Sequence, residues 1–222
     1  MIALEVFGDK ACFVKPGLDD VKQSFDFLTP SAAKGILESF YWHPHIHYVI
    51  DEIRVLEPIH FSTDVIEHHS EIGNGWLSGY ELPEDQTERF EVLNHVRYLI
   101  LAHYVLSGEE RENVNSSKTM AILKRRVQRH KPFKTPCLGC RQYPCHYNWV
   151  DMKEVNDEKY KGIHMSGSFD LMLYDFSYEG RNKSPMWYHP VMKNGVVDLR
   201  NLTVICRGEE TVVNKVKLQM DA

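Results

Sequence analysis

Four side chains that can bind a metal lie close together between residues 137 and 146. They are Cys137, Cys140, Cys145 and His146. Three thiolates and one imidazole could form a tetrahedral zinc site. Structural zinc usually joins two ligand pairs separated by a longer span, whereas here the adjacent Cys145 and His146 would have to reach one ion. The spacing favours ordinary, partly buried thiols, and we expect neither a metal nor another cofactor.

Histidine is plentiful, but its spacing indicates no known site. His43, His45 and His47 alternate at the spacing of one strand face, with no carboxylates beside them in a recognised ligand pattern. Surface and packing roles are therefore favoured. The chain also has no Gly-rich phosphate loop, no HExxH motif and no GxSxG motif. Nucleotide hydrolysis and serine-hydrolase chemistry are not indicated.

Positive charge is concentrated in one part of an acidic chain. The 222 residues carry a formal net charge of −5, which by itself argues mildly against a nucleic-acid partner. Residues 113–150 nevertheless contain no Asp or Glu. Their basic residues are Lys118, Lys124, Arg125, Arg126, Arg129, Lys131, Lys134 and Arg141. Because phosphate binding depends on local charge, this window is either a phosphate-binding surface or a solvated helix face.

A helix predicted over residues 117–130 would arrange this charge. Its apolar positions form a buried stripe of Met120, Leu123 and Val127. Positions seven and eleven residues apart return to nearly the same angle, so Lys118, Arg125 and Arg129 would share a face. That face would be a basic ridge, which is a form that a phosphate backbone can bind.

An earlier helix is predicted from Pro30 to Tyr41. Thr29 is a suitable N-cap, and Pro30 suits the first helical position. Its apolar stripe is Ala33, Ile36, Leu37, Phe40 and Tyr41. Since Tyr41 ends this stripe, its ordinary role would be core packing. His43-Pro44 would stop the helix.

The remaining pattern predicts strands. They fall at residues 2–7, 48–56, 59–66, 94–106, 169–176, 187–192 and 196–204, with Asn194-Gly195 as a hairpin turn. Residues 71–87 carry several Gly and predict a loop or a loose hairpin. The order fits an α+β fold, with a ferredoxin-like domain over residues 1–134 and an antiparallel β domain over residues 135–222.

No apolar run approaches the roughly 18 residues of a membrane span. The first residues alternate like a strand and lack the pattern of a signal peptide. We therefore expect a cytoplasmic protein.

One cleavage reaction needs none of the missing motifs. In RNA the ribose 2′-OH is an internal nucleophile beside its own phosphate, so a protein need only position it, move protons and neutralise charge. A tyrosine or histidine near a lysine could suffice without a metal. Tyr41 and Lys118 are candidates, although each pattern alone is also that of a core tyrosine and a solvated lysine.

Six collinear segments carry a family resemblance. They are residues 7–13 (FGDKACF), 24–42 (SFDFLTPSAAKGILESFYW), 49–56 (VIDEIRVL), 102–104 (AHY), 137–144 (CLGCRQYP) and 191–196 (VMKNGV). Together they resemble the Cas-five family of type I-C (Dvulg) CRISPR systems. The resemblance implies a ferredoxin-like RAMP domain with a C-terminal β domain. It also implies metal-independent cleavage of CRISPR precursor RNA at the base of the repeat hairpin, which leaves a 2′,3′-cyclic phosphate.

The resemblance also implies a catalytic set. A tyrosine in the first helix matches Tyr41, and the lysine of a Lys-His pair that opens the later helix matches Lys118. The histidine position holds Thr119, which does not titrate near neutral pH. His103 or His130 could substitute for it.

Two hypotheses follow from the resemblance. In the first, the chain is an endoribonuclease that stays on the 5′ handle of the crRNA with other subunits of a Cascade complex. The residues expected to hold the RNA are Lys34, Lys124, Arg125, Arg126 and Arg129. In the second, the chain binds the handle and cuts nothing, which Thr119 favours. The resemblance leaves open whether the chain also binds double-stranded DNA.

Overall fold

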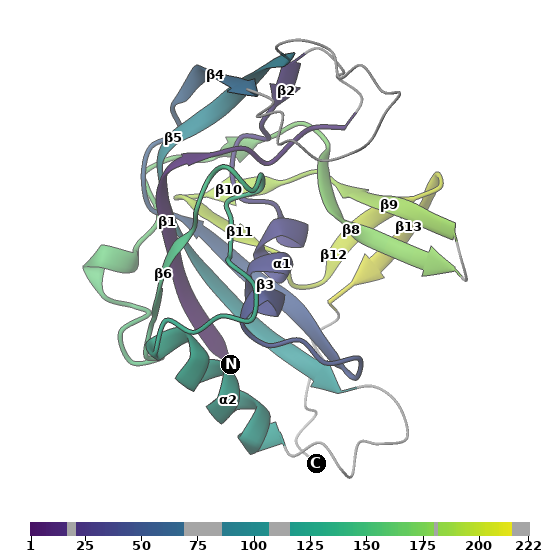
Figure 1. Cartoon of the computed structure of the whole chain (residues 1–222). Coiled ribbons are helices and arrows are strands. Elements are labelled where there is room, and N and C mark those ends of the chain that lie inside the picture. The colour runs from purple at the N-terminus through teal and green to yellow at the C-terminus, as the bar shows by residue number, and fades with distance from the viewer. Residues whose placement is uncertain (17–20, 69–85, 107–115, 180–181, 215–222) are drawn as a thin grey trace, which may run out of the picture.

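A long antiparallel sheet forms the centre of the fold. In this computed structural model, residues 1–16, 21–68, 86–106, 116–179 and 182–214 are described. Four strands of the sheet lie in the order β6-β1-β5-β3 (Figure 1): β6 (His146–Trp149), β1 (Ile2–Ala11), β5 (Gln86–Leu106) and β3 (Ile46–Val55). All three pairings are antiparallel.

The two helices pack on one face of this sheet (Figure 1). Inward-facing residues of β1, β3 and β5 meet the apolar stripes of α1 (Pro30–Phe40) and α2 (Ser116–Gln128) in one core. The opposite face has a smaller core that includes Leu99, Leu101 and Tyr160, the last from the short helix η2 (Glu158–Tyr160). Because side chains alternate along β5, neighbouring residues of that strand belong to different cores.

The ends of the sheet are extended by shorter strands. The first part of β5 pairs with β4 (Phe61–His68) and, in parallel, with β2 (Val21–Gln23). β3 is followed across the sheet by β11 (Val196–Asp198), β10 (Val191–Lys193) and β7 (Gly167–Ser168). Asn194 and Gly195 both have positive φ, 50° and 74°, which confirms the hairpin turn predicted between β10 and β11.

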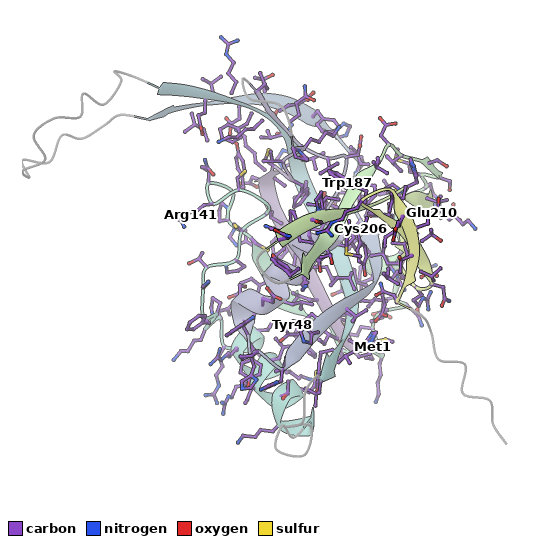
Figure 2. All side chains as sticks on the ribbon, turned by 90° about the vertical axis from the view of Figure 1, so that its right-hand side faces the viewer. Met1, Tyr48, Arg141, Trp187, Cys206 and Glu210 are labelled. Atoms are coloured by element: carbon purple, nitrogen blue, oxygen red, sulfur yellow. The ribbon has the colours of Figure 1, made fainter. Side chains whose placement is uncertain are left out.

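A second, four-stranded sheet lies beside α1. Its order is β13-β12-β9-β8, with β8 (Met172–Glu179), β9 (Asn182–Tyr188), β12 (Leu202–Cys206) and β13 (Glu209–Val213). In Figure 2, Trp187, Cys206 and Glu210 mark this sheet, and Tyr48 marks β3 of the central sheet at a separate place. Strands β6, β7, β10 and β11 follow residue 135 yet pair into the central sheet. The predicted boundary between residues 134 and 135 stays a prediction, and the sheets do not divide there.

The secondary structure confirms the two predicted helices and several of the predicted strands within the described residues. The single strands predicted over 187–192 and 196–204 are wrong, because each is divided between the two sheets. The α+β class is confirmed, and Thr29 caps α1 by accepting a hydrogen bond from the Ala32 amide. The strand predicted over 94–106 begins earlier, at Gln86, where β5 pairs with β4 and buries Phe90, Val92 and Leu93. Most of the predicted loop at 71–87 lies outside the described residues. No helix in the described part of the chain is long and apolar enough to cross a membrane.

Candidate nucleic-acid interface

The C-terminal end of α1 is held by α2 and β3. The helix ends at Phe40, and Tyr41 is extended, with φ −151° and ψ 116°. Arg126 of α2 donates from Nη1 to the Phe40 carbonyl at 2.7 Å, and its guanidinium lies 5.3 Å from the centroid of the Tyr41 ring. Tyr48, labelled in Figure 2, donates its hydroxyl to the Tyr41 carbonyl at 2.7 Å. Tyr41 is therefore a half-buried side chain whose backbone and ring both have fixed partners.

A basic cavity of about 470 Å³ lies at the C-terminal end of α2. It is lined by Arg125, Arg126, Arg129, Lys131, Pro132 and Phe133. His130 has a φ of 50°, and this left-handed residue ends α2 and turns the chain back toward α1. The amides of Phe133 and Lys134 then donate to the Ser39 carbonyl at 2.8 and 3.0 Å. The cavity is therefore built against the same end of α1 that carries Tyr41.

The structure brings three of the five predicted RNA-binding residues together. Arg125, Arg126 and Arg129 share the basic cavity. Lys34 instead forms an ion pair with Asp175 of β8 at 2.7 Å. Lys124 pairs with Asp151 at 2.9 Å and lies over the ring of Trp149. These two lysines already have acidic partners, so the arginines are the stronger candidates for phosphate contacts.

Lys118 lies in the first turn of α2, whereas the α2 residue next to Tyr41 lies more than two turns later. The α2 side chain that contacts the Tyr41 ring is Arg126. Lys118 is exposed and lies eight residues earlier, which is about 12 Å along a helix axis. An RNA backbone that reaches from Tyr41 to Lys118 would therefore run along α2, past the basic ridge.

Thr119 points into the core. Its exposed fraction is 3%, and it continues the buried stripe of α2 with Leu123 and Val127. The sequence pattern assigned Met120 to that stripe, and Met120 is only partly buried. Because it is buried, this threonine presents no side chain on the exposed face of α2.

Replacement of Thr119 by histidine is expected to destabilise the fold. The larger imidazole must enter a packed core and lose its hydration, so the free energy of unfolding should fall by about 1–3 kcal/mol. This corresponds to a drop in Tm of roughly 2–12 °C for a chain of this size. Thermal melting followed by circular dichroism measures it. An unchanged Tm with faster RNA cleavage would show that the helix can rotate this position outward.

The two candidate substitute histidines lie on different faces of the sheet. His103 pairs through Nδ1 with Asp51 at 2.8 Å, on the face opposite Tyr104, whose ring lies against Tyr48. His130 lies 5.3 Å from the ring of Tyr147, which in turn lies 4.5 Å from Phe40. His130 is therefore on the side of Tyr41, and His103 is not.

Sequence reasoning missed three features of this surface. The sequence grouped Arg126 with the RNA-binding residues but did not show that it contacts Phe40 and Tyr41. The imidazoles of His43 and His45, two and four residues after Tyr41, lie 5.3 Å apart. Phe133 is exposed at the edge of the basic cavity. The sequence signal for Phe133 was its position between Lys131 and Lys134, in a window without acidic residues.

The cysteine-rich segment folds against β1. Cys137 donates to the Gly139 carbonyl, Cys145 donates to the carbonyl of His146, and the His146 ring stacks on Phe7. Gly139 has a φ of 85°, and an added Cβ would lie 1.9 Å from the Cys12 carbonyl oxygen, so only glycine fits there. Among the residues that the structure describes, no three His, Cys, Asp or Glu side chains form a group that could hold a metal.

Cys140 is expected to be the most reactive thiol of this segment. A hydrogen bond from the Cys12 thiol lowers the pKa of Cys140 to about 7, whereas burial raises the pKa of Cys137. The Cys140 thiolate is therefore present above about pH 7, and alkylation by iodoacetamide should modify Cys140 before Cys137. Peptide mass spectrometry across about pH 6 to 10 measures both rates. Cys12→Ala removes the donor and should move the Cys140 rate profile to higher pH; equal profiles in both proteins would contradict the prediction.

Comparison with known proteins agrees with the resemblance. A family model described as CRISPR-associated protein (Cas_Cas5) matches residues 1–200. A protein of Mannheimia succiniciproducens named CRISPR pre-crRNA endoribonuclease Cas5d is 33% identical over 217 residues, covering 89% of this chain and 94% of the relative. A protein of the same name from Thermus thermophilus is 30% identical over 179 residues, covering 80% and 73%.

Solved structures share the fold. One described as a CRISPR-associated protein superposes with a TM-score of 0.68 at 20% identity, over 89% of this chain and 90% of that one. A functionally uncharacterized protein from Streptococcus mutans superposes with a TM-score of 0.65 at 21% identity, over the same shares. At this identity the likeness shows the fold alone. The family model and the curated relatives show more: the chain belongs to the Cas5 family of CRISPR-associated proteins, and within it to the type I-C branch.

Proposed function

We propose that this chain is an endoribonuclease that cleaves precursor crRNA within the repeat. The observation that supports the proposal is the contact between Tyr41 and Arg126 at the edge of the basic cavity, because the Tyr41 ring lies next to arginine side chains that suit a phosphate. The two curated relatives are named as pre-crRNA endoribonucleases. Tyr41 is also the position that the resemblance assigns to catalysis.

In the proposed reaction, Tyr41 orients or deprotonates a ribose 2′-OH. The 2′-oxygen forms a bond to the adjacent phosphorus, the bond from phosphorus to the 5′-oxygen breaks, and a proton goes to that oxygen. Lys118 stabilises the charge on the phosphorane-like transition state, for which its long side chain must extend along α2 toward Tyr41, and Arg125 and Arg129 hold the backbone. The products are a 2′,3′-cyclic phosphate and a 5′-OH, and no metal takes part.

We also infer a ferredoxin-like unit that positions the site. The order β1, α1, β3, β5, α2, β6 and the sheet order β6-β1-β5-β3 support it, with β2 and β4 as additions at one end. β6 lies beyond residue 134, so this unit would extend past the predicted domain boundary. After cleavage the chain would stay on the 5′ handle as a subunit of a Cascade complex.

The test uses the repeat RNA of the host in the presence of EDTA. Wild-type protein should produce two fragments, one ending in a cyclic phosphate, and Lys118→Ala should bind the RNA with a strongly reduced cleavage rate. Once the cut position is mapped, an RNA with a single 2′-deoxy sugar at that nucleotide should bind equally well and stay intact. Cleavage of the deoxy substrate would overturn the mechanism. A duplex DNA of the repeat sequence, added as competitor, tests DNA binding in the same experiment.

The second candidate function is a handle-binding subunit without nuclease activity. The burial of Thr119 at the position that the resemblance assigns to histidine favours it, because that position supplies no titratable group. Under this hypothesis the wild-type protein binds the repeat RNA tightly and yields no product. That outcome would overturn the endoribonuclease proposal and leave RNA binding in place.

A further inference from the structure

A second cavity adjoins the basic cavity, and the side chain of Phe133 lines both. It has a volume of about 630 Å³ and lies over the outer face of α1, between that helix and the segment that follows α2. Its walls include Gly35, Ile36, Trp42, Phe133 and Pro136. Phe133 lines both cavities, so its ring is the wall that separates an apolar pocket from a cluster of arginines.

Two aromatic rings in this pocket are exposed to solvent. Trp42 is 57% exposed and Phe133 is 69% exposed. Both are attached to fixed backbone: Trp42 follows Tyr41, and the Phe133 amide donates to the Ser39 carbonyl at 2.8 Å. Large exposed aromatic side chains on fixed backbone beside a cavity are typical of surfaces that bind a partner.

Gly35 leaves the floor of the pocket open. It lies inside α1, where glycine is less favourable than alanine. A Cβ added there would have no heavy atom of a neighbouring residue within 4 Å, so close packing does not require the glycine. A larger side chain at this position would instead project into the cavity.

The two cavities differ in charge, and each suits a different part of a nucleotide. The basic cavity carries Arg125, Arg129 and Lys131, which suit a phosphate. The apolar pocket carries Lys134 and Glu38, and the Glu38 carboxylate would repel a phosphate but accept a hydrogen bond from a base amino group. Aromatic rings stack on any base, because every base has a π-face.

We propose that Trp42 and Phe133 form a stacking site for an unpaired nucleotide of the bound RNA, with its base in the apolar pocket and its phosphate on Arg125 and Arg129. The inference rests on the RNA binding of the proposed function and names the part of the RNA that is recognised. A base in a hairpin stem is already stacked and paired, so the nucleotide belongs to the single-stranded flank. This places the flank along α1 and the phosphates along α2.

The test measures RNA affinity rather than cleavage. Repeat RNA with its single-stranded flank is compared with the same RNA whose flank carries abasic sugars. Phe133→Ala and Trp42→Ala should each weaken binding of the flanked RNA by about 5- to 150-fold, as expected for loss of a stacked base. Neither should change the affinity for the abasic RNA. Phe133→Tyr retains a ring and should restore tight binding.

Two further variants separate stacking from effects on folding. Gly35→Leu keeps both aromatic rings and fills the pocket, so it should weaken the flanked RNA and not the abasic RNA, whereas Gly35→Ala should do neither. Phe61→Ala is the matched control, because Phe61 is 41% exposed on β4 and lies outside both cavities.

The possible outcomes keep this proposal distinct from the nuclease proposal. Equal affinities of wild type and Phe133→Ala for the flanked RNA would overturn the stacking site, even if the wild type cuts RNA. Equal losses of the variants on flanked and abasic RNA would overturn it as well. Flank-specific losses in a protein that cuts nothing would support the stacking site and reject only the nuclease.

Discussion

Replacement of Tyr41 by phenylalanine is expected to lower the rate of repeat-RNA cleavage by about 10²–10⁴-fold, with RNA affinity almost unchanged. The substitution removes only the hydroxyl. The Tyr41 ring remains beside the Arg126 guanidinium. The Tyr41 carbonyl accepts from Tyr48 and the Tyr41 amide donates to Leu37, so the Tyr41 hydroxyl takes no part in either hydrogen bond. Single-turnover cleavage at saturating protein gives the rate, and equilibrium binding of an uncleavable 2′-deoxy substrate gives the affinity.

Tyr48→Phe is the matched control for this prediction. It also removes one hydroxyl, from a buried tyrosine that donates to the Tyr41 carbonyl, and it should lower the free energy of unfolding by about 1 kcal/mol. Its cleavage rate should fall far less than that of Tyr41→Phe. Equal rates for Tyr41→Phe and wild type would show that Tyr41 acts only as a packing residue. A parallel loss of affinity and rate would assign the hydroxyl to RNA binding.

Local elements of this fold could be predicted because their signals are local. Thr29, Pro30 and the spacing of Ala33, Leu37 and Phe40 define α1 without reference to other parts of the chain. The same holds for Leu123 and Val127 in the buried stripe of α2 and for the turn at Asn194-Gly195. In each case the residues that determine the element lie within a few positions of one another.

The sheets could be predicted only in part, because pairing depends on distant segments. β6 has four residues and little pattern of its own, yet its register with Leu4 and Val6 makes it an edge of the central sheet. β5 changes partners near His95, which has a φ of 49°: β4 pairs with the residues before it and β3 with those after it. Nothing in the sequence near His95 specifies that exchange.

The candidate site could also be predicted only in part from the sequence. The basic ridge of arginines is a local pattern, whereas Tyr41 was named as a site residue through the family resemblance, and both roles stay predictions. The sequence could not show which basic side chain contacts Tyr41, because that depends on how α1 packs on α2. It also could not separate His103 from His130, since the choice depends on which face of the sheet each one occupies. Burial of Thr119 is a further consequence of that packing.

Replacement of Arg126 by alanine is expected to reduce both RNA affinity and stability, whereas Arg125→Ala and Arg129→Ala should reduce affinity alone. Arg126 donates to the Phe40 carbonyl and lies over the Tyr41 ring, so its loss should lower the free energy of unfolding by about 1–3 kcal/mol. Arg125 and Arg129 are exposed residues of the basic cavity, and loss of either removes charge with little effect on packing.

Three measurements test this prediction together. Thermal melting should separate Arg126→Ala from the other two variants. For each variant that loses a phosphate contact, the slope of log affinity against log salt should become less steep by about 0.7–0.9. Arg126→Lys keeps the charge but not the planar fork, so it should retain the salt slope and still lower the cleavage rate, because Tyr41 loses the group that positions its ring. A normal cleavage rate in Arg126→Lys would mean that this contact contributes charge alone.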